Sequence, residues 1–388
     1  MDIIKCIGPL VPEMKEWRRY LHAHPETAFQ EINTSEFIAE KLKSFGLEAH
    51  KGMAKTGVIG ILKRGSKDDA IGLRADIDAL AIHEESYLEY KSQNPGKMHA
   101  CGHDGHTTML LGAAKYLAER GKFNGAIYFI FQPAEENEGG GRVMVEEGIF
   151  DKYPMRSIFA LHNYPGLPVG YFAIRTGPFA AAYDVFDIII KCKGGHAGTP
   201  HVAQDPVIVA AYLIAMLQTI VSRNIDPIDT AVVSVTTVHG GTEYNVLPDI
   251  VSLSGTTRHF TPHAQDLVEA RIKSIAAGVA SSFGMNIEVK YQRRYPPLVN
   301  SPQETEQAVE TAAEMVGREN VLTNIPPGSS SEDFAFMLQK KPGAYMIIGA
   351  GTADAGHLLH QSKYDFNDEV LPIGVGYWVA MAESLLPP

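Results

Sequence analysis

Short apolar runs alternate with amphipathic segments over the first third of the chain, and this alternation restricts the fold more than any other feature. Residues 58–62, 70–73 and 126–131 are apolar runs typical of buried strands, whereas residues 34–45 and 106–118 show the apolar spacing of helices. Strands that alternate with helices form a sheet whose faces the helices cover. We therefore predict an α/β fold.

The pattern changes near residue 184. The segments from there to residue 294 predict a strand, a helix, two strands, a helix and a strand, an order typical of a small α+β layer. After Pro296 the α/β pattern resumes. The 388 residues therefore predict two domains, since domains contain about 100 to 200 residues each. The larger domain is expected in two parts, 1–182 and 295–388, and the smaller domain is expected as an insertion at 183–294.

Charge and the N-terminal sequence limit the partners. Acidic residues outnumber basic residues, 45 to 34, and neither sign forms a long run. We expect no nucleic-acid partner, because a protein that binds nucleic acid needs a basic face to neutralise the phosphates. The N-terminus lacks a secretory signal, and we expect no window of about 18 residues that is apolar enough to span a membrane. A cytoplasmic protein without a membrane partner is the expectation.

A dense group of metal-ligating residue types occupies residues 98–107, with the sequence MHACGHDGHT, directly before a predicted helix. Cys101 and His103 are two residues apart, so in an extended or turn conformation both side chains can reach one ion at about 2.0 to 2.3 Å. The alternative is a hydrogen-bonded loop that caps the helix without a metal.

Further ligand types follow other predicted strands. Glu135 and Glu136 come after the strand 126–131, His162 ends the apolar run IFALHNY, and His360 lies in the segment HLLHQSKYDFND before the last helix. Open α/β sheets bind ligands beyond the carboxyl ends of their strands. Of two adjacent glutamates, one can bind a metal while the other deprotonates a water. Each residue alone could belong to a surface turn, but their distribution over one sheet favours a metal site.

The chain resembles the metal-dependent amidohydrolases and peptidases that include aminoacylases, hippurate hydrolase and the plant auxin-conjugate (IAA-amino acid) hydrolases. The resemblance covers nearly the whole chain and is closest to the branch of hippurate and auxin-conjugate hydrolases. It runs through the segments LHAHPETAFQE, GLRADIDAL, MHACGHDGHT, QPAEE, ALHNYPG, GGHAGTP, YNVLPD, SGTTR, SSEDFAFM and LHQSKYDFND.

The resemblance implies a zinc-peptidase-like catalytic domain with a mixed sheet flanked by helices, and a ferredoxin-like inserted domain that acts as a lid and dimerisation module. It also implies two divalent ions per subunit, which zinc, manganese, cobalt or nickel could supply. The implied ligands are Cys101, Glu136 and His360 for one ion, and Cys101, His103 and His162 for the other, with the Cys101 thiolate bridging both. Glu135 then falls on the position of the general base.

The resemblance assigns roles to five further residues. Asp76 and Asp78 are expected to orient metal ligands. In the inserted domain, His196 and Asn245 are expected to reach the substrate, with His196 as an oxyanion donor that the partner subunit could supply. Arg258 is expected to bind the substrate carboxylate, because a guanidinium group pairs with both carboxylate oxygens.

The implied reaction is hydrolysis of the amide bond of N-acyl amino acids, with N-acetyl or N-benzoyl groups as in hippurate, by a homodimer or a larger oligomer built from dimers. Deacetylation of an N-acetyl-diamino acid and dipeptide hydrolysis on the same scaffold remain alternatives. A different class is a hydrolase with Cys101 as nucleophile and His103 or His106 as base. A third class is a metal-binding protein without catalysis.

Overall fold

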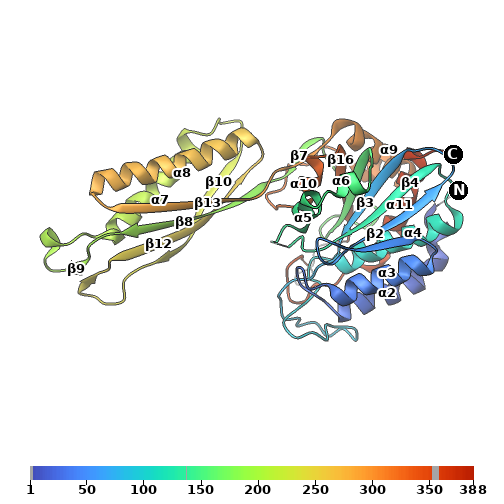
Figure 1. Ribbon diagram of the computed structural model, residues 1–388, viewed down its shortest axis with the longest axis horizontal. Helices are drawn as coiled ribbons and strands as arrows, with labels where there is room; N and C mark the ends of the chain where they lie inside the picture. The colour runs from blue at the N-terminus through green and yellow to red at the C-terminus, as the bar shows by residue number, and fades with distance from the viewer. Residues whose placement is uncertain (1–2, 137, 352–357) are drawn as a thin grey trace. The chain divides into compact units, whose positions relative to one another are not determined.

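The computed structural model describes residues 3–136, 138–351 and 358–388 (Figure 1). The chain forms two compact units. The first contains the residues up to Phe179, Val299–Pro326 and Asp333–Pro388, and the second contains Ala180–Leu298 and Pro327–Glu332. The predicted insertion, 183–294, lies inside the second unit, but the unit also takes in the late segment Pro327–Glu332. The amide of Ala181 donates hydrogen bonds to the carbonyls of Gly328 and Ser330 at 3.1 and 2.9 Å, which ties this segment to the start of the unit.

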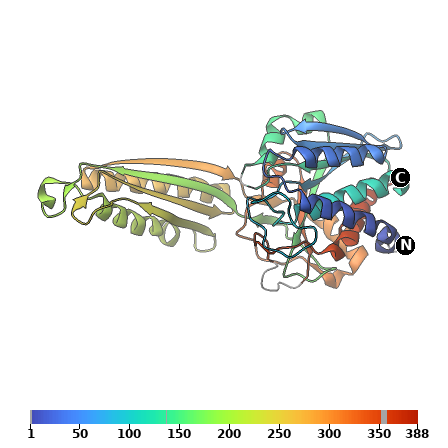
Figure 2. The same ribbon diagram turned by 90° about the horizontal axis from the view of Figure 1, so that it is seen from below.

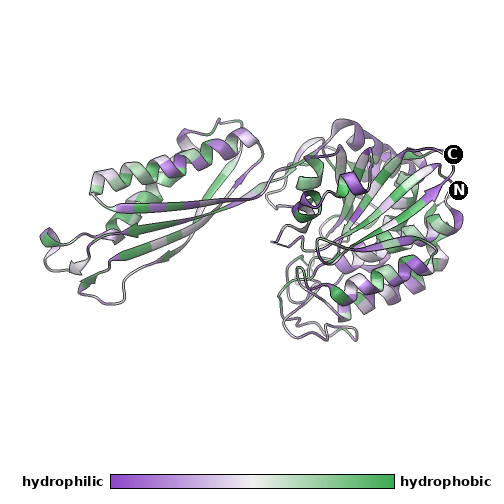
Figure 3. Ribbon diagram, in the orientation of Figure 1, coloured by the Kyte–Doolittle hydropathy of each residue, from purple (hydrophilic) through white to green (hydrophobic). Residues whose placement is uncertain are grey.

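An eight-stranded mixed sheet forms the centre of the first unit, with the order β1-β2-β4-β3-β5-β16-β6-β15. The strands are β1 (Glu48–Met53), β2 (Gly57–Arg64), β3 (Ala70–Asp76), β4 (Gly125–Gln132), β5 (Ser157–Tyr164), β6 (Phe172–Ala173), β15 (Val321–Leu322) and β16 (Gly343–Gly349). Every residue of β3 and β4 is buried. Strands buried on both faces read as continuous apolar runs, which is the pattern seen in the sequence (Figure 3).

Helices cover this sheet, which confirms the predicted α/β class with a mixed sheet. α4 and α11 pack on each other and on β3, α3 packs on β1 and β2, and α9 packs on β16. α5 and α10 pack on each other, against β4 and β5 respectively. The helices are α1 (Ile3–Ile7), α2 (Val11–Ala23), α3 (Ile32–Ser44), α4 (His103–Arg120), α5 (Gly140–Glu146), α6 (Ile149–Lys152), α9 (Pro302–Val316), α10 (Phe334–Leu338) and α11 (Leu371–Leu385).

Three strands end at one edge of the sheet. β3 pairs in parallel with both β4 and β5, and Asp76 at the end of β3 lies opposite Gln132 at the end of β4. The loops that follow Asp76, Gln132 and Tyr164 therefore leave the sheet on the same side. These loops and the turn before α4 carry most of the residues predicted to form the metal site.

The second unit is a four-stranded antiparallel sheet with the order β10-β12-β8-β13. α7 and α8 lie side by side on one face of this sheet (Figures 1 and 2). The elements, in the predicted order, are β8 (Ala182–Lys191), α7 (Pro206–Arg223), β10 (Ala231–His239), β12 (Ile250–His259), α8 (Pro262–Phe283) and β13 (Asn286–Tyr295). β7 (Gly177–Ala180) and β14 (Leu298–Asn300) contain points where the chain passes between the units.

Local sequence fixes both helices of the second unit. Asp205 precedes Pro206, and its side chain accepts the amides of Val207 and Ile208 at 3.0 and 3.2 Å, so it caps α7. Thr261 caps α8 in the same way, since its hydroxyl accepts the amide of Ala264 at 3.1 Å. Alternate residues of β8 are buried and pack against the helices.

α7 corrects one sequence expectation. Among the described residues it is the one helix that is long and apolar enough to cross a membrane by length and composition, with a mean hydropathy of 1.6. The helix is this apolar because two of its faces carry apolar residues. Val209, Leu213, Leu217 and Ile220 are fully buried in the core of the second unit, while the other face exposes a second apolar set. A single such helix, packed on a sheet, is weak evidence for a membrane span.

Candidate metal centre

A tight turn places Cys101 and His103 on either side of Gly102, at the start of α4. Gly102 has a φ of +91°. A Cβ atom there would lie 2.5 Å from Asn163 Oδ1 and 2.7 Å from the Tyr364 hydroxyl, so only glycine fits. The thiol and the imidazole are thus presented from one rigid turn at the edge where β3, β4 and β5 end.

The structure brings the five predicted metal ligands together. Potential ligand atoms of Cys101, Glu136 and His360 lie within 4.8 Å of one another, and so do those of Asp76, His103, His106 and His162. Cys101 Sγ lies 3.5 Å from His162 Nε2 and so connects the two groups. Glu136 Oε1 lies 3.2 Å from His360 Nε2. The backbone of His360 is held here because its amide donates to the Ala100 carbonyl at 2.7 Å. His357, in the same predicted segment, lies outside the described residues.

Two atoms of this cluster test whether a metal fits. Within the part of the chain that the structure describes, His103 Nε2 is buried and forms no hydrogen bond, and the buried Glu136 Oε1 faces His360 Nε2 at 3.2 Å without the geometry of a hydrogen bond. A buried polar atom without a hydrogen bond destabilises a protein by about 1–3 kcal/mol, so these atoms call for a cation. Thiolate, imidazole and carboxylate donors together suit zinc, and also manganese, cobalt or nickel. The residues therefore fit a metal centre.

Backbone carbonyls orient two of the histidines. His103 Nδ1 lies 2.9 Å from the Asp78 carbonyl, and His162 Nδ1 lies 2.7 Å from the Asn163 carbonyl. An Nδ1–H that donates to a carbonyl leaves the Nε2 lone pair free for a cation. Burial and the neighbouring His106 keep the pKa of His162 well below its usual range, so His162 is neutral, as a metal ligand must be.

Asp76 is buried between Arg74 and His106. Its Oδ2 accepts a hydrogen bond from Arg74 Nη1 at 2.8 Å, and its Oδ1 lies 2.6 Å from His106 Nδ1. His106 Nε2 accepts the amide of Asn163 at 3.0 Å. Both ring nitrogens of His106 are therefore engaged, and this histidine supports the site through Asp76 and Asn163. The sequence pattern placed His106 in the group of metal-ligating residue types and offered it as a base, but it did not indicate this supporting role, although a position three residues after His103 puts both on one helix face.

These contacts disfavour Cys101 as a catalytic nucleophile. Burial and the Glu136 carboxylate raise the pKa of the Cys101 thiol, whereas nucleophilic catalysis needs a thiolate. His106 does not offer a base to the thiol because both of its ring nitrogens are engaged. A cation beside Cys101 would stabilise the thiolate, which favours the ligand role.

Glu135 and Glu136 follow β4 on a loop that Asp78 holds. Asp78 Oδ1 and Oδ2 accept the backbone amides of Glu135 and Glu136 at 3.1 and 3.0 Å. One side-chain oxygen of Glu135 lies within 4.8 Å of potential ligand atoms of His103 and Glu136, and Glu135 is 7% exposed. Asp78 thus positions His103 and both glutamates at once.

The predicted substrate-binding residues lie in the second unit. His196 in β9 (Gly195–His196) pairs with Val246 in β11 (Val246–Leu247), and the Asn245 carbonyl accepts the amide of Ala197 at 2.9 Å. Arg258 on β12 stacks 4.5 Å over the ring of Tyr183 and donates to Thr256 Oγ1 at 2.6 Å. His196 and Asn245 are therefore neighbours, and the contact of all three with substrate stays a prediction.

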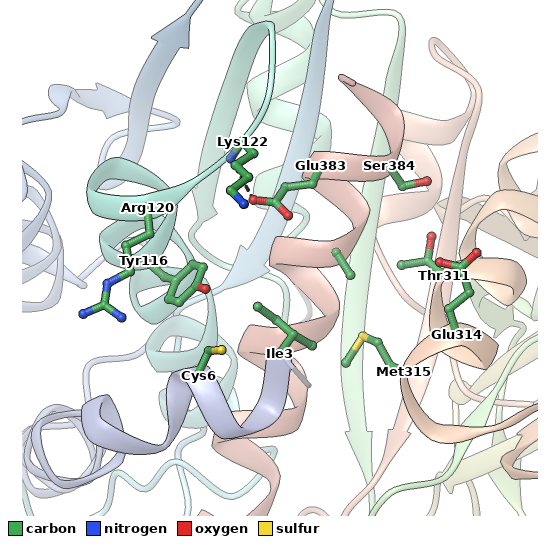
Figure 4. Close-up of a pocket in the computed structure, with 11 residues that line it drawn as sticks. Ile3, Cys6, Tyr116, Arg120, Lys122, Thr311, Glu314, Met315, Glu383 and Ser384 are labelled. Atoms are coloured by element: carbon green, nitrogen blue, oxygen red, sulfur yellow. Dashed lines mark hydrogen bonds between the residues drawn. The ribbon is translucent and has the colours of Figure 1, made fainter. Parts of the chain in front are cut away.

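A hollow of about 610 Å³ in the first unit lies elsewhere (Figure 4). Its lining includes Tyr116 and Arg120 from the end of α4, together with Lys122 and Glu383. His103 is the first residue of α4 and Tyr116 lies 13 residues further along the helix, so about 20 Å of helix separates the hollow from the metal centre. The hollow takes no part in the site.

Comparison with known proteins gives four matches, which are one family profile, two relatives and one solved structure. The sequence profile of peptidase family M20/M25/M40 matches residues 72–384. The chain is 40% identical to the hippurate hydrolase of Campylobacter jejuni over 386 residues, covering 100% of both chains. It is 38% identical to the N-acetylcysteine deacetylase of Bacillus subtilis over 371 residues, covering 95% of this chain and 96% of the relative. A solved Bacillus subtilis structure, described as a dinuclear metal-binding peptidase of the M20 family, matches with a TM-score of 0.84 and 34% identity over 98% of this chain and 99% of the other.

Proposed function

The chain belongs to peptidase family M20/M25/M40 and is a metal-dependent hydrolase, and from this premise we propose that it hydrolyses N-acyl amino acids. The substrates carry N-acetyl or N-benzoyl groups, and the products are a carboxylate and a free amino acid. The family resemblance inferred from the sequence motifs is confirmed. Relatives of this chain include a hippurate hydrolase and an N-acetylcysteine deacetylase, which supports an N-acyl amino acid as the substrate class.

We propose that Cys101, Glu136 and His360 hold one divalent ion, and that Cys101, His103 and His162 hold a second. The grouping of these side chains and the dinuclear relative both support this division. When bound, the ions polarise the scissile carbonyl and lower the pKa of a water molecule. Zinc, manganese, cobalt or nickel would suit the donors.

The placement of Glu135 is the single observation that carries the proposal. Its carboxylate is buried beside His103 and Glu136, on a backbone that Asp78 fixes. In this position the carboxylate takes a proton from the attacking water and returns it to the leaving nitrogen. A protein that only stored metal would not need this second glutamate.

Substrate binding is assigned to the second unit. The proposed arrangement has a catalytic domain of residues 1–182 and 295–388 and a lid domain of residues 183–294. His196 and Asn245 would contact the substrate carbonyl region, and the Arg258 guanidinium would bind the substrate carboxylate. The stacking of Arg258 on Tyr183 supports this role, because it holds the guanidinium plane in one orientation.

We propose a homodimer, or a larger oligomer built from dimers, that forms through the second unit. α7 exposes an apolar face, and β10 is an edge strand of the sheet. The exposed residues of that face are Val207 (49%), Ile208 (50%), Tyr212 (56%) and Met216 (42%). A second copy would cover both this face and the unpaired strand edge. The proposal places the enzyme in the cytoplasm, without nucleic-acid or membrane partners.

Two alternatives use the same scaffold, deacetylation of an N-acetyl-diamino acid and hydrolysis of a dipeptide. A panel of N-acetyl and N-benzoyl amino acids, N-acetyl-diamino acids and dipeptides separates them. Metal-depleted protein is assayed first, and each divalent metal is then added back in turn. Release of free amino acid from N-acyl amino acids only after metal addition supports the proposal. Activity that needs no metal but disappears on alkylation of Cys101 would instead assign the protein to the cysteine-nucleophile class.

A further inference from the structure

Buried carboxylates hold three consecutive backbone amides of the loop that carries Glu135. Glu31 Oε1 accepts the amide of Ala134 at 2.9 Å, and Asp78 accepts the amides of Glu135 and Glu136 at 3.1 and 3.0 Å. Glu31 is 0% exposed and Asp78 is 1% exposed. Hydrogen bonds from amides to carboxylates are stronger than those between neutral groups, so these three contacts fix the loop backbone just before the Glu135 side chain.

Ala134 adopts a conformation that needs such support. Its φ is +55°, in the left-handed region that residues with a Cβ atom rarely adopt. Its amide is bound by Glu31, and its carbonyl accepts the amide of Gly140 at 2.9 Å. A strained residue persists only where its surroundings hold it. Since Ala134 directly precedes Glu135, its backbone angles determine the direction in which the Glu135 side chain leaves the loop.

Glu31 is itself locked in place. Its second oxygen accepts a hydrogen bond from Thr56 Oγ1 at 2.6 Å. Glu31 stands at the start of α3, and Thr56 lies between β1 and β2, so the loop is braced against two other elements. Burial and the neighbouring Asp78 raise the pKa of Glu31 to about 7, which shows that this carboxylate occupies an unfavourable environment. A backbone carbonyl or a hydroxyl could accept the hydrogen bond of a single loop amide with a smaller loss of stability than a buried carboxylate.

We propose that Glu31 is a positioning residue for the hydrolytic reaction, because it holds the Ala134 backbone so that the Glu135 carboxylate stays in place for proton transfer. The inference rests on the proposed role of Glu135. Among the described residues, the Glu31 side chain forms no hydrogen bond with the proposed metal ligands, and it acts through the loop. A displacement of about 1 Å in a reacting group can lower a rate by about a hundredfold, so a small shift of this loop would be visible in kcat.

Substitution of Glu31 tests the proposal. Glu31→Ala removes the acceptor, and we expect kcat to fall at least about tenfold while KM and the metal content per subunit stay within about twofold. Glu31→Gln keeps an oxygen for the Ala134 amide, and we expect it to restore kcat to within about threefold of the parent enzyme. Glu31→Asp keeps the charge but is too short to reach both Thr56 and Ala134. It should lower kcat, and it decides the question if Glu31→Ala does not fold.

Glu26→Ala is the matched control. Glu26 is also nearly buried, at 8% exposure, and accepts the amides of Asn33 and Thr34 at 3.2 and 2.9 Å, but its side chain makes no contact with the loop among the described residues. Loss of a merely structural glutamate should lower the melting temperature and leave kcat unchanged. An equal loss of kcat in Glu26→Ala and Glu31→Ala would overturn the proposal.

A double-mutant cycle separates positioning from general damage. In a Glu135→Gln background, Glu31→Ala should lower the residual rate by less than about twofold, because Glu31 acts through Glu135. A full additional tenfold loss would contradict this. A crystal structure of Glu31→Ala tests the inference without any assay, since Ala134 and Glu135 should leave their positions. An unmoved loop would overturn the inference even if the substrate class proposed for the enzyme is wrong, whereas a wild-type enzyme inactive on all N-acyl amino acids would overturn only the proposed function.

Discussion

Cys101 Sγ and His162 Nε2 lie 3.5 Å apart, although the residues belong to different elements and are 61 positions apart in the sequence. The same sulfur groups with Glu136 and His360, so it is the one atom that both proposed ion sites share. A thiolate is the donor in this set that binds zinc-like ions most strongly, and a bridging thiolate would hold both ions at once.

Cys101→Ser should therefore lose both metals. We expect at least about a tenfold loss of metal affinity, because even residues that only support a ligand contribute about 10–100-fold. Metal content after dialysis against a chelator, measured by mass spectrometry, checks this. Cys192→Ser is the control, since Cys192 is a free thiol in the second unit. If Cys101→Ser keeps two ions per subunit, the bridging role is wrong.

Glu135→Gln should keep the metals and lose activity. Removal of a general acid or base lowers a rate by about 10²- to 10⁴-fold, so we expect kcat to fall at least about a hundredfold. Glu138→Gln, on the exposed part of the same loop, should have parent activity. Measurement of the metal content of both variants shows whether the loss of activity comes from the missing general base or from loss of the metals. A Glu135→Gln variant that loses its metals would place this glutamate among the ligands.

The charged network around His22 predicts a pH-dependent stability. Burial alone would lower the pKa of His22, but hydrogen bonds to Asp104 at 2.8 Å and Glu84 at 3.3 Å raise it to about 9. A raised folded pKa stabilises the protein below the unfolded value of 6.5, and this contribution is lost as the pH rises through about 9. The pKa shift sets an upper limit of about 3 kcal/mol on the contribution of His22 protonation to the free energy of unfolding.

His22→Gln measures this contribution. The free energy of unfolding of the metal-depleted parent should exceed that of His22→Gln by more at pH 6 than at pH 9.5, as measured by urea denaturation. The comparison with the variant cancels the effects of titrating groups that do not contact His22, and the lowered pKa values of Asp104 and Glu84 keep both carboxylates ionised over this range. A constant difference across this range would show that His22 is not protonated in the folded protein.

The strands and the ligand residues could be predicted from the sequence because their signals are local. Buried parallel strands are continuous apolar runs, as in β3 and β4, and the polar residues that follow them must gather at one edge of the sheet. Cys101 and His103 stand out for the same reason, since both lie in one short turn. The additional step was to infer that the residues following different strands meet at the same edge of the sheet and there form one metal site.

The supporting contacts could not be predicted, because they join residues far apart in the chain. Glu31 lies 103 positions from Ala134, and His106 lies 57 positions from Asn163. The attachment of Pro327–Glu332 to the second unit is a backbone contact that leaves no pattern in side-chain type. The two apolar faces of α7 could not be predicted from its apolar residues, since composition does not separate core residues from exposed ones.

The exposed face of α7 gives the last prediction. Tyr212 and Met216 are four residues apart, so they lie on one side of the helix, and they are 56% and 42% exposed. If a second copy covers this face, a charge there would be buried without a partner in the dimer but would be solvated in the monomer. We therefore expect Tyr212→Asp to shift the sedimentation coefficient from dimer to monomer at micromolar concentration, with the melting temperature of the monomer little changed. Tyr87→Asp, which places the same charge at a tyrosine that is 99% exposed in the first unit, should leave the oligomer intact. A dimer that survives Tyr212→Asp would place the interface elsewhere on the protein.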